Sequence, residues 1–149
     1  MLAIPLSDPQ ATEAFGAKLA TLVQPGDVIT LEGTLGAGKT SVARGLLAAL
    51  GLAGEAPSPS FAIVQPYEPP EVRIPVLHVD LYRIDDPAEI DELALDDARY
   101  DSVLLVEWPE RAGAGYWPDA LRLSLTIEPD GTRGLTVGVP EAWRSRWPT

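Results

Sequence analysis

A chain of 149 residues is long enough to bury one hydrophobic core, so we expect a single domain over residues 1–149. It has no cysteine and one histidine, which excludes a disulfide framework and a cysteine-ligated zinc site and predicts that any bound metal ion is held by oxygen atoms. A formal net charge of −11 repels polyanions, so we expect no strong direct binding of nucleic acid. The sequence shows neither a signal-peptide pattern nor a long apolar run, which predicts a cytoplasmic protein without membrane contact.

The N-terminal segment predicts a strand followed by a helix. Residues 2–6 are mostly apolar and favour a short strand. Ser7 stands where a helix N-cap is expected, and residues 9–23 then place apolar side chains at helical spacing. Pro25 and Gly26 are expected to end this helix.

A phosphate-binding loop is predicted next. Residues 27–32 favour a strand, residues 39–50 favour a helix, and Gly33 to Thr40 between them match the Walker A pattern Gly-x-x-x-x-Gly-Lys-Thr. In such a loop, backbone N–H groups and the helix N-terminus bind phosphate oxygens. Lys39 then bridges the β- and γ-phosphates, and the Thr40 hydroxyl binds Mg²⁺. The sequence therefore predicts a site for a nucleoside triphosphate with Mg²⁺.

The remaining segments predict an α/β fold. Residues 102–107 hold an uninterrupted apolar run, typical of a central strand buried on both faces. Asp130 and Gly131 favour the turn of an antiparallel hairpin at the edge of the sheet. Further strands are expected at 61–67, 72–80, 121–127 and 135–139, and a further helix at 86–95. Together these elements predict a P-loop NTPase-like three-layer domain, with a mixed, partly parallel central sheet and an antiparallel edge hairpin.

Phosphoryl chemistry also needs a carboxylate near the metal ion, usually at the end of a neighbouring buried strand. Glu107 and Asp80 each end a predicted strand, and the apolar run before Glu107 makes it the stronger candidate. His78 lies on one face of the strand that ends in Asp80, where burial statistics favour a core residue over a catalytic one.

Two further segments have a functional and a structural interpretation. Ser58 to Phe61 form either a plain turn or, because they follow the loop helix, a segment that senses the γ-phosphate. Trp108, directly after Glu107, either closes the core or offers a surface to a partner protein.

Taken together, these motifs resemble the TsaE family, the small bacterial ATPases of tRNA threonylcarbamoyladenosine synthesis. The resemblance covers nearly the whole chain. It rests on four segments, which are in chain order Gly36 to Thr40 with Arg44 and Gly45 of the following helix, Ser58 to Phe61, His78 to Arg83, and Glu107 to Glu110. Two positions depart from the family pattern, because Thr34 replaces a usual aspartate and Ser60 replaces a usual threonine.

The resemblance implies an ATPase that is weak alone and acts with TsaD and TsaB, with ATP and Mg²⁺ as cofactors. Its hydrolysis of ATP would reset the complex that modifies tRNA, while the acidic chain itself would not bind tRNA strongly. Thr40 and Glu107 would hold Mg²⁺, Asp80 would stand beside them as a further metal-binding candidate, and Lys39, Glu107 and Asp80 would carry catalysis. Ser7 and Arg133 would lie near the base, and the full set implied for nucleotide binding is Ser7, Leu35, Gly36, Ala37, Gly38, Lys39, Thr40, Ser60, Trp108 and Arg133.

Three other functions share the loop. A small-molecule kinase normally carries an arginine-rich lid, which the sequence does not show. A regulatory GTPase normally carries an Asn-Lys-x-Asp segment, and both lysines of this chain lie before residue 40. A nucleotide-binding scaffold without turnover stays open, because no arginine is an obvious catalytic finger.

Overall fold

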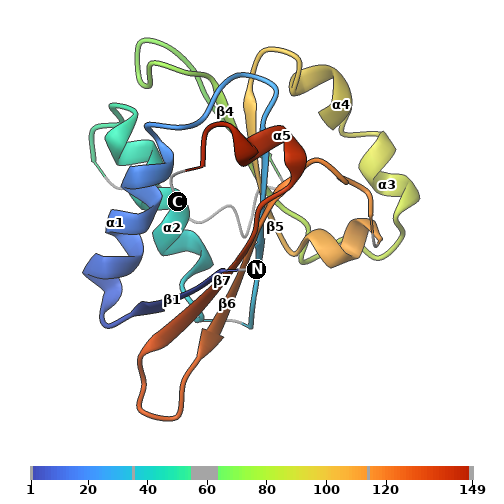
Figure 1. Ribbon diagram of the computed structural model, residues 1–149. Helices are drawn as coiled ribbons and strands as arrows, with labels where there is room; N and C mark the ends of the chain where they lie inside the picture. Colours follow the sequence, from blue (N-terminus) through green and yellow to red (C-terminus); the bar gives the residue numbers. More distant parts are fainter. Residues whose placement is uncertain (1, 35, 55–63, 114, 148–149) are drawn as a thin grey trace.

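The computed structural model describes residues 2–34, 36–54, 64–113 and 115–147. Within these ranges a seven-stranded mixed sheet forms the middle layer, in the order β1-β7-β6-β2-β5-β4-β3 (Figure 1). The strands are β1 (Leu2–Leu6), β2 (Val28–Glu32), β3 (Val64–Tyr67), β4 (Val76–Asp80), β5 (Val103–Glu107), β6 (Leu121–Ile127) and β7 (Arg133–Gly138). The helices are α1 (Pro9–Leu19), α2 (Lys39–Ala49), α3 (Ala88–Asp91), α4 (Leu95–Ala98) and α5 (Glu141–Arg144), with a 3-10 turn η1 (Pro109–Ala112).

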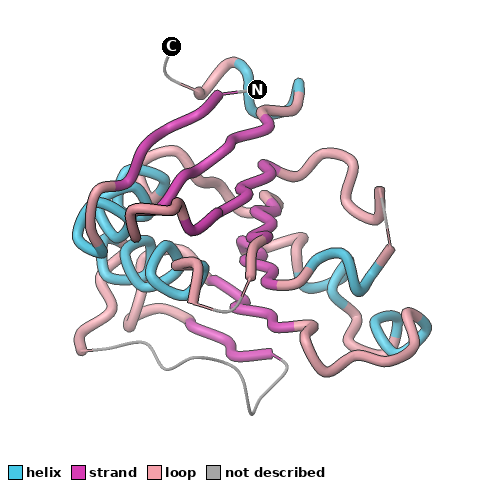
Figure 2. Tube along the Cα trace, turned by 90° about the horizontal axis from the view of Figure 1, so that it is seen from below, coloured by secondary structure: helices cyan, strands magenta, loops and turns pink. Residues whose placement is uncertain are grey.

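The sheet separates two hydrophobic clusters. Figures 1 and 2 show α1 and α2 on one side of the strands and α3 and α4 on the other. Along β5, Leu105 belongs to the cluster that includes Leu46 of α2, whereas Leu104 belongs to the cluster that includes Ile90 of α3. Every residue of β5 is buried, as an uninterrupted apolar run predicts for a central strand. The predicted three-layer α/β domain with a mixed sheet is confirmed.

The centre of the sheet is parallel. Strands β6, β2, β5 and β4 run in one direction, and β7, β1 and β3 pair antiparallel at the two ends. Glu107 is the register partner of Leu31 on one side and of Asp80 on the other. The carboxyl ends of β2, β5 and β4 therefore meet at one edge, where ligands bind in open α/β sheets.

Three predictions of local structure are wrong. The hairpin β6–β7 forms, but β1 pairs outside β7, so the hairpin lies one strand in from the edge. The single helix expected over 86–95 is two short helices, because Ala94 has a left-handed backbone (φ 52°) that interrupts it. The chain bends over residues 72–74 of the strand expected at 72–80, and the strand covers only Val76–Asp80.

The start of α1 also differs from the prediction. Asp8, not Ser7, caps the helix, because its carboxylate oxygen accepts a hydrogen bond of 2.7 Å from the N–H of Ala11. Pro9 then occupies a first-turn position, where its missing N–H costs nothing. At the other end α1 stops at Leu19 instead of residue 23, and the chain tightens into a turn over residues 20–22.

Two glycines let α1 and α2 cross closely. A Cβ atom placed on Gly16 of α1 would collide with the backbone of Val42, and one placed on Gly45 of α2 would collide with the backbone of Glu13. Because both neighbours are backbone atoms, they cannot move aside as a flexible side chain could. The helix that follows the phosphate loop is thereby held against its neighbour.

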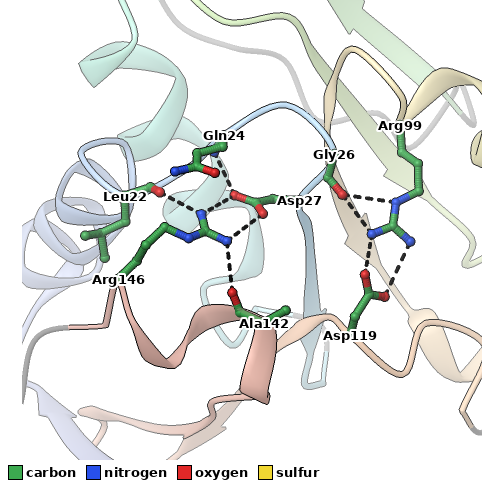
Figure 3. A network of polar contacts seen from close by, with 8 residues as sticks. All are labelled: Leu22, Gln24, Gly26, Asp27, Arg99, Asp119, Ala142 and Arg146. Carbon is green, nitrogen blue, oxygen red and sulfur yellow. Dashed lines mark hydrogen bonds and ion pairs between the residues drawn. The ribbon is translucent and has the colours of Figure 1, made fainter.

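Two arginines anchor the segment that leads into β2 (Figure 3). Arg146, after α5, donates to both carboxylate oxygens of Asp27 at 2.6 and 2.9 Å and to the carbonyl of Leu22 at 2.8 Å. From the other side Arg99 binds the carbonyl of Gly26 at 2.7 Å and a carboxylate oxygen of Asp119 at 2.6 Å. The strand that carries the phosphate loop is therefore fixed at its beginning by groups distant in the sequence. Within the described residues, no helix has the length and apolar character needed to cross a membrane.

Candidate active site

The phosphate loop leaves β2 after Glu32 and enters α2 at Lys39. Gly36 and Gly38 have φ angles of 81° and 111°, which side chains with a Cβ rarely adopt, so glycine is required at both turns. Gly38 stands at the N-cap of α2 and has no side chain to occupy the first N–H groups of the helix. Those groups and the helix dipole can therefore bind phosphate oxygens.

Lys39 is buried at the junction of the loop and the strand ends. Its side-chain ammonium donates to the carbonyls of Gly33 at 2.5 Å and Thr34 at 3.1 Å, and it lies 4.2 Å from the centroid of the Trp108 ring. Burial lowers the pKa of Lys39, and the negative charges of Glu107, Glu110 and Asp80 act in the opposite direction. A cation is thus held beside several carboxylates.

Threonine at position 34, where the resembled pattern has aspartate, does not disturb the hydrogen bond from Lys39. The position contributes its backbone carbonyl to Lys39, and a carbonyl is present whatever the side chain is. The residue itself is exposed and lines an open cavity that also includes Glu32 and Glu110. The loop therefore keeps its lysine anchor without the aspartate usual at this position.

The two predicted acids lie side by side at the carboxyl ends of β4 and β5. Asp80 and Glu107 are register partners, and both face the side of the sheet that α1 and α2 cover, as the alternation along each strand requires. An oxygen of Asp80 accepts a hydrogen bond of 2.9 Å from the N–H of Tyr82. Burial raises the pKa of Asp80, and the charge of Glu107 raises it further.

His78 is joined to this acidic pair. It is 0% exposed, as expected of a core residue, but its Nε2 lies 2.6 Å from Oε2 of Glu107, which is itself buried. The residue pattern did not point to this pairing. One sequence signal for it exists: His78 stands two positions before Asp80 on a strand, so both side chains face the same side.

A second part of the site lies where the N-terminus of α1 meets the β6–β7 hairpin. Ser7, Arg133, Gly36 and Gly38 line a cavity of about 240 Å³ there. The Arg133 guanidinium donates to the carbonyl of Gly36 at 3.1 Å, which links the hairpin to the phosphate loop. Ser7 thus fails as a helix cap, but it lines this cavity together with Arg133, the other residue predicted to lie near the base. Asp8 is a lining residue that the sequence did not single out.

The other predicted residues have defined places. Thr40 is half-buried in the first turn of α2, and Ala37 is buried under the loop. Trp108 has a left-handed backbone (φ 60°), and its ring centroid lies 4.9 Å from that of Tyr82. Leu35, Ser60 and the rest of the segment 58–61 lie outside the described residues.

Known proteins are similar to this chain in sequence and in fold. A family model described as "Threonylcarbamoyl adenosine biosynthesis protein TsaE" matches residues 6–135. The tRNA threonylcarbamoyladenosine biosynthesis protein TsaE of Streptomyces coelicolor is 39% identical over 86% of this chain and 90% of that protein. The protein of the same name from Bacillus subtilis is 40% identical over 87% of this chain and 80% of that protein. A crystal structure of Bacillus subtilis YdiB matches with a TM-score of 0.81 and 29% identity, covering 97% of this chain and 89% of that one.

The matched residues include the phosphate loop, both strand-end acids and Arg133 of the hairpin. The two relatives are covered over 90% and 80% of their own length. The chain belongs to the TsaE family.

Proposed function

We propose that this chain is a Mg²⁺-dependent ATPase of tRNA threonylcarbamoyladenosine biosynthesis, acting in the cytoplasm with TsaD and TsaB. The names of its relatives support the pathway. The observation that best supports ATP hydrolysis is that Lys39 of the phosphate loop lies close to the carboxylates of Asp80 and Glu107. Phosphoryl transfer requires this combination of a phosphate cradle, a cation and metal-binding acids.

The triphosphate would lie on the loop between Gly36 and Thr40. Backbone N–H groups at the start of α2 would donate to its oxygens, and Lys39 would neutralise the β- and γ-phosphates. The cavity beside Ser7 and Arg133 opens next to Gly36 and Gly38, so it is placed to receive the nucleoside end of the same molecule. Its lining is partly polar and partly apolar, which suits a ribose and a base.

The residues present fit Mg²⁺. Thr40, Asp80 and Glu107 offer oxygen atoms only, which are the ligands that Mg²⁺ prefers. Within the described part of the chain, no group of three or more His, Asp or Glu side chains could hold a metal ion alone. Mg²⁺ that is bound with a nucleotide usually takes one or two carboxylates and completes its shell with phosphate oxygens and water. When bound, the ion would supply charge neutralisation at the phosphates.

Glu107 is the residue we assign to orienting the attacking water. It is buried at the carboxyl end of β5 and acts on the ammonium of Lys39 through its charge. Asp80, held by the N–H of Tyr82, would assist at the metal ion. Hydrolysis would release phosphate and ADP, and the change in charge at the loop would be passed to the partner proteins.

The charge of the chain supports action through protein partners. A net charge of −11 opposes direct contact with the tRNA backbone, so the tRNA is better bound by another subunit. The rings of Trp108 and Tyr82, which contact each other at a tilt of 52° at the edge of the site, form a surface on which a partner could sense the nucleotide.

Steady-state ATP hydrolysis by the full chain, alone and with purified TsaD and TsaB, tests this function. We expect slow release of inorganic phosphate by the chain alone, acceleration by the two partners together, and loss of activity on chelation of Mg²⁺. Transfer of phosphate to a small molecule would identify a kinase instead. Tight ATP binding without hydrolysis under every condition would identify a scaffold.

A further inference from the structure

The pair formed by His78 and Glu107 crosses the β4–β5 ladder diagonally. The register partner of His78 is Leu105, and that of Glu107 is Asp80. The imidazole of His78 therefore contacts a carboxylate on the neighbouring strand, two residues beyond its register partner in the direction of the site. Its other ring nitrogen, Nδ1, is buried and has no hydrogen-bond partner among the described residues. The hydrogen bond that the structure records for this ring is thus made to Glu107.

The two acids of the site are held in different ways. Asp80 is half-buried and accepts a backbone N–H from its own end of β4. Glu107 is 3% exposed, and a buried carboxylate without a partner is costly. His78 occupies Oε2 of Glu107 at 2.6 Å, which leaves Oε1 as the oxygen that can take part in chemistry.

We propose that His78 is the positioning residue of this site. It acts through Glu107, by fixing the rotation of the carboxylate so that Oε1 is presented to Mg²⁺ or to the water that Mg²⁺ holds. This inference rests on the proposed function and deepens it, since it assigns a role to a side chain of β4 that is not part of the phosphate loop. Groups that orient a metal-binding carboxylate in this way commonly change metal affinity by about 10- to 100-fold when they are removed.

Amide variants of His78 separate positioning from packing. The amide nitrogen of glutamine can occupy the place of Nε2, whereas that of the shorter asparagine reaches only the place of Nδ1. His78→Gln therefore keeps a donor for Glu107, and His78→Asn removes it with a side chain of similar polarity. Val76→Ala is the control for a loss of stability alone. It creates a cavity on the same face of β4 and removes no polar contact.

The readout is the affinity for a fluorescent ATP analogue, measured with Mg²⁺ and with EDTA on the full chain, together with Tm. For His78→Asn we expect the dissociation constant with Mg²⁺ to rise by about 10-fold or more and that with EDTA to stay within about 2-fold. His78→Gln should remain near wild type in both. Val76→Ala should lower Tm and leave both constants unchanged. In a Glu107→Gln background, His78→Asn should cause little further loss.

Three outcomes would overturn the proposal. Equal Mg²⁺ dependence in His78→Asn, His78→Gln and wild type would show that His78 only packs. An effect of His78→Asn that is undiminished in the Glu107→Gln background would show that it does not act through Glu107. Absence of Mg²⁺-dependent binding in the wild-type chain would remove the proposed function, and this inference with it.

Discussion

The ammonium of Lys39 lies 4.2 Å from the centroid of the Trp108 ring. Trp108 follows Glu107 directly, and its left-handed backbone ends β5 at the point where the indole faces the loop lysine. The same ring contacts Tyr82, which follows the end of β4. One aromatic side chain therefore connects the phosphate loop with the ends of both acidic strands.

Lys39→Ala should abolish ATP hydrolysis and weaken ATP binding by at least about 10-fold, because the loop loses the only cation that the sequence pattern places at the phosphates. Steady-state hydrolysis and isothermal titration calorimetry would measure the two effects. Lys18→Ala is the matched control, since Lys18 is the other lysine of the chain and is exposed on α1. Wild-type rates in Lys39→Ala would exclude the loop as the catalytic site.

Glu107→Gln should slow hydrolysis by about 100-fold or more at saturating ATP, because it removes the charge that orients water and keeps the shape of the side chain. Single-turnover hydrolysis with prebound ATP separates this effect from binding. Glu110→Gln removes a neighbouring exposed charge and should slow the reaction far less. Equal rates in the two variants would argue against the role of Glu107.

Arg133→Ala should raise the KM for ATP by about 5- to 10-fold with little change in kcat, since the guanidinium holds the loop at Gly36 and lines the proposed nucleoside cavity. Arg122→Ala is the control, because Arg122 lines a different cavity, beside Thr30 and Trp117. A fall in kcat with unchanged KM would place Arg133 in the chemistry instead.

Gly45→Ala should lower the free energy of unfolding by about 1–3 kcal/mol, because the added Cβ overlaps the backbone of Glu13 where α1 and α2 cross. Urea denaturation would measure the change. Ala48→Ser, on an exposed position of the same helix, should change stability by no more than about 0.5 kcal/mol. An unchanged free energy of unfolding in Gly45→Ala would contradict the close crossing of α1 and α2.

Hydrogen bonds from Arg99 hold the pKa of Asp119 below its usual value of 3.8. A carboxylate with a lowered pKa stabilises the fold above its unfolded-state pKa, and this contribution disappears as pH falls through the folded-state value. Because both side chains are partly exposed, Asp119→Asn should cost no more than about 1 kcal/mol at pH 7.

The difference in stability between wild type and Asp119→Asn should therefore begin to shrink near pH 3.8 and vanish only below the lowered pKa of Asp119 in the folded state. Chemical denaturation of both proteins over a pH series would measure it. A difference that does not change with pH would show that Asp119 acts through packing and not through its charge.

Much of the architecture could be predicted from local patterns. The apolar run of β5 and the glycine-rich loop are each encoded in consecutive residues, so the central strand and the phosphate site followed from the sequence. The place of β1 did not, because its pairing with β7 joins the two ends of the chain, and local pattern carries no information on such a partner. The break at Ala94 was missed because alanine itself favours a helix.

The candidate site divides in the same way. Lys39, Asp80 and Glu107 were found from a motif and from strand ends, and Ser7 and Arg133 only from the family resemblance. The partner of His78 could not be inferred, because burial in a strand is the usual state of such a residue and the diagonal contact depends on the register of β4 against β5. His78 is both a buried core residue, as predicted, and a polar partner of Glu107, which was not predicted.

The most direct test is the threonylcarbamoyladenosine content of tRNA, measured by mass spectrometry in cells depleted of this protein. We predict that the modification falls on depletion, returns when wild type or Lys18→Ala is supplied, and does not return with Lys39→Ala. Unchanged modification after depletion, or full recovery with Lys39→Ala, would contradict an ATP-dependent role in this pathway.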